Sequence, residues 1–184
     1  FLYCGCLPCH LLLIRQISAD RIIAFQIGTY EGLWLVIFVF LIVVATDIGG
    51  YYFGSKFGKH KLSPVISPKK TIEGALGATA LALIVASFGV FYTKLTLFHA
   101  LFAGFLITVS SQLGDLSESL VKRDAGVKDS SNILPGHGGI LDRTDGYLFA
   151  LPVAYYYFVN FACGHNIILE FFKYIQGAIN VYFG

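Results

Sequence analysis

The residues best suited to chemistry lie in and beside two polar segments, 55–73 and 115–145, that interrupt a very apolar sequence. If residues 111–123 form a helix, their spacings of three and four place a set of polar side chains on one face. This set is Ser111, Asp115, Ser119 and Lys122. Mg²⁺ prefers carboxylate and hydroxyl oxygens and completes its coordination with water and substrate phosphates. The pattern therefore predicts a magnesium site for a substrate that carries phosphate.

The same segment continues with groups that suit a phosphate. The flexible backbone of residues 136–139 can wrap one, and Arg143 can bind one through two parallel hydrogen bonds. Asp142 and Asp145 follow at a helical spacing of three. His137 has two interpretations of equal weight, because it could orient a phosphate oxygen or be a loop histidine bonded to backbone.

A simpler interpretation of this segment is a solvated loop with salt bridges, such as Glu118 to Lys122 at four residues. We favour that interpretation for Glu118, Asp124 and Lys128 taken singly. It does not account for the whole set of acidic, basic and glycine residues.

The first polar segment combines glycines, lysines and two Ser-Pro steps. Lys69 and Lys70 could supply point charges for a polyphosphate. The alternative is a basic anchor followed by an ordinary helix start over 67–73, with proline near the helix entrance and Glu73 in the first turn. Asp47 ends a long apolar run, and an ionisable residue at membrane depth indicates function because of its desolvation cost.

The composition indicates a membrane protein. Of the 184 residues, 56% are hydrophobic and 13% charged, and the mean hydropathy is +0.71, whereas soluble domains have about 25% charged residues. We expect an all-α, polytopic integral membrane protein, because apolar runs approach the roughly 20 residues that cross a bilayer. The predicted spans are about 1–14, 33–54, 74–92, 97–114 and 146–162. The tail from residue 163 could be an interfacial helix or part of another span.

Basic residues predict the orientation in the membrane. Segment 55–73 holds five Lys and Arg and segment 115–145 holds four, out of thirteen. Two spans separate the segments, so both face the same side, which the positive-inside rule makes the cytoplasm. The formal net charge of +2 is too small to favour nucleic acid as a partner.

Cys4, Cys6, Cys9 and His10 could be imagined as a zinc site. Their apolar flanks favour buried thiols instead, and Cys163 with His165 makes a poor second ligand pair. We expect no disulfide and no zinc.

Two long patterns resemble one family, the phosphatidate cytidylyltransferases. From Ser119 to Asp145 the sequence fits SxxKRxxxxKDxxxxxPxHGGxxDRxD, and the run from Thr46 to Gly74 resembles the family's upstream segment ending SPKKTxEG. The resemblance covers nearly the whole chain. It implies an enzyme of phospholipid biosynthesis, a nucleotidyltransferase that converts CTP and phosphatidate to CDP-diacylglycerol and pyrophosphate. The chain begins inside an apolar run without Met, so we interpret 1–184 as a single membrane-embedded catalytic region from the C-terminal part of a longer enzyme.

The resemblance also implies roles for individual residues. Asp115 and Asp142 would bind metal, with Ser119 assisting. These two aspartates would be catalytic together with Lys122, Arg123 and Arg143, which, like Lys128, would hold the triphosphate or the lipid phosphate. The substrate-binding residues would be Lys69, Lys70, Ser119, Lys128, His137, Gly138 and Gly139. The family further implies Mg²⁺, acting with a monovalent cation such as K⁺, a homodimer, and a bacterial inner membrane or its equivalent.

Three other functions compete with this one. A CTP-dependent polyprenol or dolichol kinase, or a CDP-archaeol synthase, would use the same ion and side chains. A transporter would predict matching glycine or proline breaks in two related halves, which the sequence lacks. A structural scaffold would not require the spacing of the second polar segment.

Overall fold

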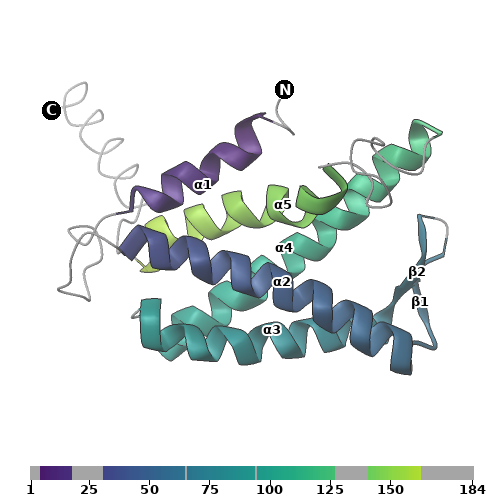
Figure 1. Ribbon diagram of the computed structural model, residues 1–184, viewed down its shortest axis with the longest axis horizontal. Helices are drawn as coiled ribbons and strands as arrows, with labels where there is room; N and C mark the ends of the chain where they lie inside the picture. Colours follow the sequence, from purple (N-terminus) through teal and green to yellow (C-terminus); the bar gives the residue numbers. More distant parts are fainter. Residues whose placement is uncertain (1–4, 18–30, 65, 94, 127–140, 163–184) are drawn as a thin grey trace, which may run out of the picture.

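The computed structural model describes residues 5–17, 31–64, 66–93, 95–126 and 141–162. Helices dominate them (Figure 1). In chain order the elements are α1 (Leu7–Arg15), α2 (Glu31–Phe57), β1 (Lys61–Ser63), β2 (Ser67–Thr71), α3 (Ile72–Thr93), α4 (Leu97–Asp124), α5 (Leu141–Tyr157) and the π-helical turn η3 (Phe158–Ala162).

Three of the five predicted spans correspond to helices long and apolar enough to cross a membrane. These are Gly32–Phe57 in α2, α3 and α4. The first predicted span contains the nine-residue α1, and the fifth corresponds to the 17-residue α5 and η3. Neither meets the same length and hydropathy requirement in the described ranges, so the mostly helical fold agrees with the prediction, and three of the five expected spans are confirmed as candidates.

Much of the second polar segment is helical, although we expected a loop. Helix α4 continues from the apolar span through Asp124, and α5 already begins at Leu141. Lys122 and Arg123 in the last turn of α4 interact favourably with the negative end of the helix dipole. The helix considered over 111–123 is therefore confirmed, and the loop expected over 115–145 is wrong for the part that belongs to α4 and α5. Residues 127–140 lie outside the described residues.

A two-stranded antiparallel hairpin occupies the first polar segment, where we expected a loop and a helix start. Lys61 pairs with Thr71 and Ser63 with Ser67, with an irregularity between these pairs. Helix α3 begins only at Ile72, because the Thr71 hydroxyl accepts a hydrogen bond from the Gly74 N–H and caps the helix. The expectation that 67–73 simply starts a helix is wrong for Ser67–Thr71.

Small residues let α2 and α3 pack closely. The buried face of α3 consists of Gly74, Ala78, Ala82, Ala86, Gly89 and Thr93. A Cβ added at Gly49 of α2 would lie 2.8 Å from the Cα of Ala78, so the two backbones approach as closely as glycine allows. Phe38, Ile42 and Val43 of α2 join Ile107 of α4 and residues of α5 in the main apolar core.

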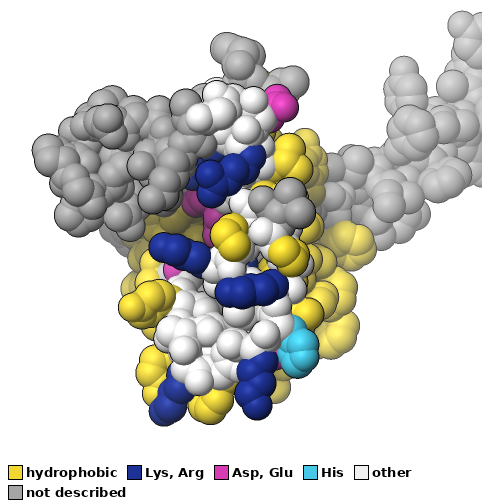
Figure 2. All heavy atoms as spheres, turned by 90° about the vertical axis from the view of Figure 1, so that its right-hand side faces the viewer, with side chains coloured by type: hydrophobic (Ala, Val, Ile, Leu, Met, Phe, Trp, Pro, Cys, Tyr) yellow, Lys and Arg dark blue, Asp and Glu magenta, His cyan; other side chains and the backbone are white. Residues whose placement is uncertain are grey.

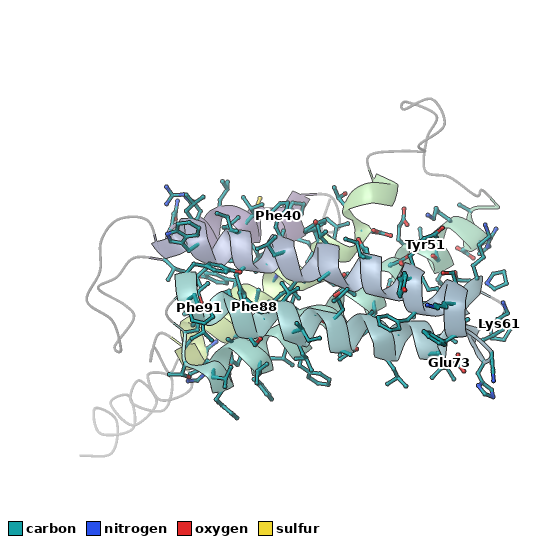
Figure 3. All side chains as sticks on the ribbon, turned by 60° about the horizontal axis from the view of Figure 1, so that its bottom comes forward. Phe40, Tyr51, Lys61, Glu73, Phe88 and Phe91 are labelled. Carbon is teal, nitrogen blue, oxygen red and sulfur yellow. The ribbon has the colours of Figure 1, made fainter. Side chains whose placement is uncertain are left out.

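The two ends of the helices differ in chemistry. Lys61 and Glu73 lie at the hairpin end, whereas Phe88 and Phe91 lie toward the other end (Figure 3). Viewed from the hairpin end, several lysine and arginine side chains are spread over a face of other side chains and backbone, and hydrophobic side chains border this face (Figure 2). The exposed basic residues at this end are Lys56, Lys59, Lys61, Lys69 and Arg123. We call this surface the basic end face.

Candidate active site

A cavity of about 330 Å³ opens at the basic end face, beside the hairpin. Helices α2, α3 and α4 and both strands contribute to its wall. The lining residues are Thr46, Asp47, Gly50, Tyr51, Leu62, Lys69, Lys70, Thr71, Gly74, Ala75, Ala78, Ser111, Gln112 and Asp115. The cavity therefore joins the two polar segments, which are separated in the sequence by the two predicted spans over 74–92 and 97–114.

An ion pair joins two residues of the cavity wall. The ammonium nitrogen of Lys70, on β2, lies 2.5 Å from Oδ2 of Asp115, on α4. Both side chains are partly exposed, at 25% and 39%. Asp47 of α2 lines the same cavity, so a second carboxylate is available there.

A second group of charges lies one turn along α4. The Glu118 carboxylate, 2% exposed, forms an ion pair of 2.7 Å with Lys122. The salt bridge expected at four residues is thus present, but Glu118 is buried and not part of a solvated loop. Partial burial and the neighbouring charge of Asp115 raise the pKa of Asp145 to about 8. Carboxyl groups from α4 and α5 therefore converge where a negative charge is poorly solvated.

The hairpin is tied to the start of α3. One Glu73 carboxylate oxygen lies 2.6 Å from Nδ1 of His60, and the carboxylate accepts hydrogen bonds from the backbone N–H groups of Lys59 and His60. At the other end of the hairpin, Nε of Arg123 donates a long hydrogen bond of 3.5 Å to the Ile66 carbonyl. These contacts hold the strand that carries Lys69 and Lys70 beside the cavity.

The structure brings some predicted site residues together and separates others. Asp115, Lys69 and Lys70 share the cavity, whereas Ser119, Lys122 and Arg123 are not among its lining residues. The loop residues Lys128, His137, Gly138 and Gly139 lie outside the described residues. Asp142 and Arg143 belong to the first turn of α5, but their side chains also lie outside what the structure describes.

Sequence reasoning missed several cavity residues. Thr46 and Gln112 lie within or beside apolar runs, where a polar side chain is usually explained by hydrogen bonds within or between helices. The Thr46 hydroxyl does bond to the Ile42 carbonyl of its own helix, and the Gln112 amide donates to the Ala75 carbonyl across the helix interface. A usable signal was the presence of these polar residues next to Asp47 and Asp115.

The cysteine cluster shows local contacts within its described residues. The Cys9 thiol donates to the Gly5 carbonyl, and Nδ1 of His10 lies 3.0 Å from the Cys6 carbonyl oxygen. Cys6 and Cys9 are free thiols. Cys4, Cys163 and His165 lie outside the described residues.

The cavity's donor set fits Mg²⁺. Among the described side chains no group of three His, Cys, Asp or Glu could hold a metal. Mg²⁺ does not need such a group, since one or two carboxylates with water and substrate phosphates suffice. Asp115 and Asp47, with the nearby Ser111 hydroxyl and Gln112 amide, offer hard oxygen atoms of that kind.

Comparison with known proteins agrees with this chemistry. The sequence pattern of the cytidylyltransferase family matches residues 1–161. The chain is 50% identical over 125 residues to the phosphatidate cytidylyltransferases of Staphylococcus haemolyticus and Staphylococcus aureus strain COL, covering 67% of this chain and 48% of each relative. It is 48% identical over 130 residues to that of Synechocystis, covering 70% and 44%. The chain thus spans about half the length of the curated relatives it matches.

The match extends across all three candidate spans and both segments that form the cavity. Together with the apolar helices, it shows that the molecule is a membrane protein and that the chain belongs to the cytidylyltransferase family.

Proposed function

We infer that the complete protein containing this chain is a phosphatidate cytidylyltransferase, which joins CTP to phosphatidate and releases pyrophosphate. The observation that carries this inference is a single cavity at the end of the helices that combines lysines with carboxylates. It suits a substrate pair with one water-soluble polyphosphate and one lipid phosphate. The identity to named relatives supports the choice of CTP and phosphatidate.

The reaction needs charge neutralisation more than a base. The second pKa of a phosphomonoester is about 6, so the attacking lipid phosphate is already an oxyanion at neutral pH. The obstacle is the repulsion between this dianion and the triphosphate. Fixed cations that reduce this repulsion and stabilise the leaving pyrophosphate supply catalysis of the electrostatic kind.

The side chains of the cavity have matching roles in this proposal. Lys69 and Lys70 hold phosphate oxygens, and Asp115, with Asp142 and Ser119 implied by the family resemblance, would hold Mg²⁺. Bound there, Mg²⁺ would act as a Lewis acid on the phosphoryl oxygens. No covalent enzyme intermediate is required, so Ser119 acts as a ligand and not as a nucleophile. The K⁺ implied by the resemblance would add further positive charge.

The proposal includes an orientation in the membrane. We place the basic end face in the cytoplasm, where CTP is available, and the apolar helices in the bilayer that supplies phosphatidate. The homodimer remains an expectation from the family resemblance.

Product analysis tests the function. The complete protein, incubated in detergent with phosphatidate, Mg²⁺ and CTP labelled in the α-phosphate, should give labelled CDP-diacylglycerol and unlabelled pyrophosphate. Asp115→Asn and Asp142→Asn should each lower turnover by at least about 10²-fold, the size of losing a key electrostatic stabiliser, while the protein stays folded. Near-normal turnover by either variant would remove that residue from the site.

The same assay separates the competing enzymes. A polyprenol or dolichol kinase would release labelled CDP and phosphorylate its lipid, and a CDP-archaeol synthase would prefer an ether lipid over phosphatidate. Either result would replace the proposed substrate pair.

A further inference from the structure

The two neighbouring lysines of β2 differ in their surroundings. Lys69 is exposed at the mouth of the cavity. Lys70 is half-buried, and its ammonium is paired with Oδ2 of Asp115. Sequence reasoning treated both as equivalent phosphate ligands, and the structure separates them.

The position of Lys70 has a consequence for metal binding. A cation already lies 2.5 Å from an oxygen of Asp115, the carboxylate proposed to hold Mg²⁺. An ammonium and a divalent ion at one carboxylate repel each other, and the repulsion is strong where solvent is partly excluded. Metal binding at Asp115 is therefore weakened for as long as Lys70 keeps this contact.

The hairpin allows the side chain to move while its backbone stays in place. Thr71 is 7% exposed and caps α3, and the Glu73 carboxylate accepts hydrogen bonds from the Lys59 and His60 N–H groups. Lys70 thus extends from an anchored strand on a flexible four-carbon stem with three donors. A polyphosphate in the same cavity would offer it several anionic oxygens without displacing the hairpin.

We propose that Lys70 competes with the divalent metal for Asp115 until the triphosphate of the nucleotide binds its ammonium, so that nucleotide and metal favour each other's binding at this site. This coupling rests on the proposed function, because it takes CTP and Mg²⁺ as the two ligands. The coupling is reciprocal: bound metal raises the affinity for the nucleotide by the same factor as bound nucleotide raises the affinity for the metal.

Two binding measurements on the complete protein in detergent test the competition. Mn²⁺ binding without nucleotide is followed by the loss of the free-ion electron paramagnetic resonance signal, and CTP binding is measured separately in EDTA. Lys70→Gln should bind Mn²⁺ about fivefold more tightly, at the low end of typical coupling between sites, and CTP more weakly than the wild type. Lys69→Gln, the matched control, should change Mn²⁺ affinity less than twofold.

The opposite signs of the two changes are the signature of competition. If Lys70 merely held Asp115 in place, Lys70→Gln would weaken the binding of both Mn²⁺ and CTP. Unchanged or weaker Mn²⁺ binding by this variant therefore overturns the proposal. In an Asp115→Asn background the Lys70→Gln gain should disappear, and its persistence would also overturn the proposal. Thermal unfolding confirms that each variant is folded.

The outcome is independent of the product assay. If the Mn²⁺ effect is present but the protein makes no CDP-diacylglycerol, only the proposed function is rejected. Conversely, CDP-diacylglycerol formation without the Mn²⁺ effect would reject only the role of Lys70.

Discussion

At the scale of single residues, the two partners of the Glu118–Lys122 ion pair differ in how deeply they are buried. Glu118 is 2% exposed, whereas Lys122 is 19% exposed and can extend its ammonium toward water. Removing a partner from a buried pair is costly when the remaining charge cannot reach solvent. The two partners should therefore differ in the cost of their removal.

We predict that Lys122→Met lowers the free energy of unfolding by about 3 kcal/mol, because it leaves the Glu118 carboxylate buried without its cation. Glu118→Gln should cost only about 1 kcal/mol. Unfolding in mixed detergent micelles measures both values, and the double variant completes the cycle. Equal costs would show that burial does not distinguish the two partners.

At the scale of elements, the hairpin depends on the Glu73 carboxylate. Glu73→Ala removes the acceptor for His60 and for the backbone N–H groups of Lys59 and His60. We expect the KM for CTP to rise roughly tenfold with a smaller change in kcat, because the lysines of β2 lose their fixed position.

Glu73→Gln is the matched variant for this anchor. Its amide oxygen can still accept from the backbone, so KM should rise less than in Glu73→Ala. Steady-state kinetics at saturating phosphatidate gives both parameters. An unchanged KM in Glu73→Ala would mean that the anchor does not position the lysines.

The contact between α2 and α3 offers a second test at this scale. Gly49→Ala places a Cβ 2.8 Å from the Ala78 backbone, whereas Gly50→Ala meets only the Ala78 side chain, at 3.9 Å. We predict that Gly49→Ala lowers the free energy of unfolding by about 1–3 kcal/mol through overpacking, while Gly50→Ala lowers it little or not at all. Thermal unfolding of the two variants would contradict this account if both lost the same stability.

The elements also show how far sequence reasoning reaches. Apolar runs predicted α2, α3 and α4, because the bilayer demands long apolar helices. The hairpin was missed because its pairing of Lys61 with Thr71 joins residues ten apart in a segment without strand-like alternation. The Lys70–Asp115 pair was also missed. It depends on how α3 packs against α4, and residue spacing alone does not specify that packing.

At the scale of the whole molecule, charge is distributed toward one end. The basic end face contains the cavity and the hairpin, while the connection between α3 and α4 lies at the other end of both helices (Figure 1). A nucleotide from the cytoplasm and a lipid from the bilayer can meet only where the helices leave the membrane. Orientation is therefore a requirement of the proposed reaction and can be tested separately from it.

Cysteine labelling tests the orientation in a variant that lacks native cysteines. Lys61→Cys lies on the exposed hairpin, and Leu97→Cys, at the start of α4, replaces a residue that is 53% exposed near the opposite end. A membrane-impermeant maleimide should label Lys61→Cys only when it reaches the cytoplasmic face, and Leu97→Cys only from the other side, because basic segments stay in the cytoplasm. Labelling of Lys61→Cys from the outer face would place the cavity away from CTP, and the cytidylyl transfer proposed here could not occur in that orientation.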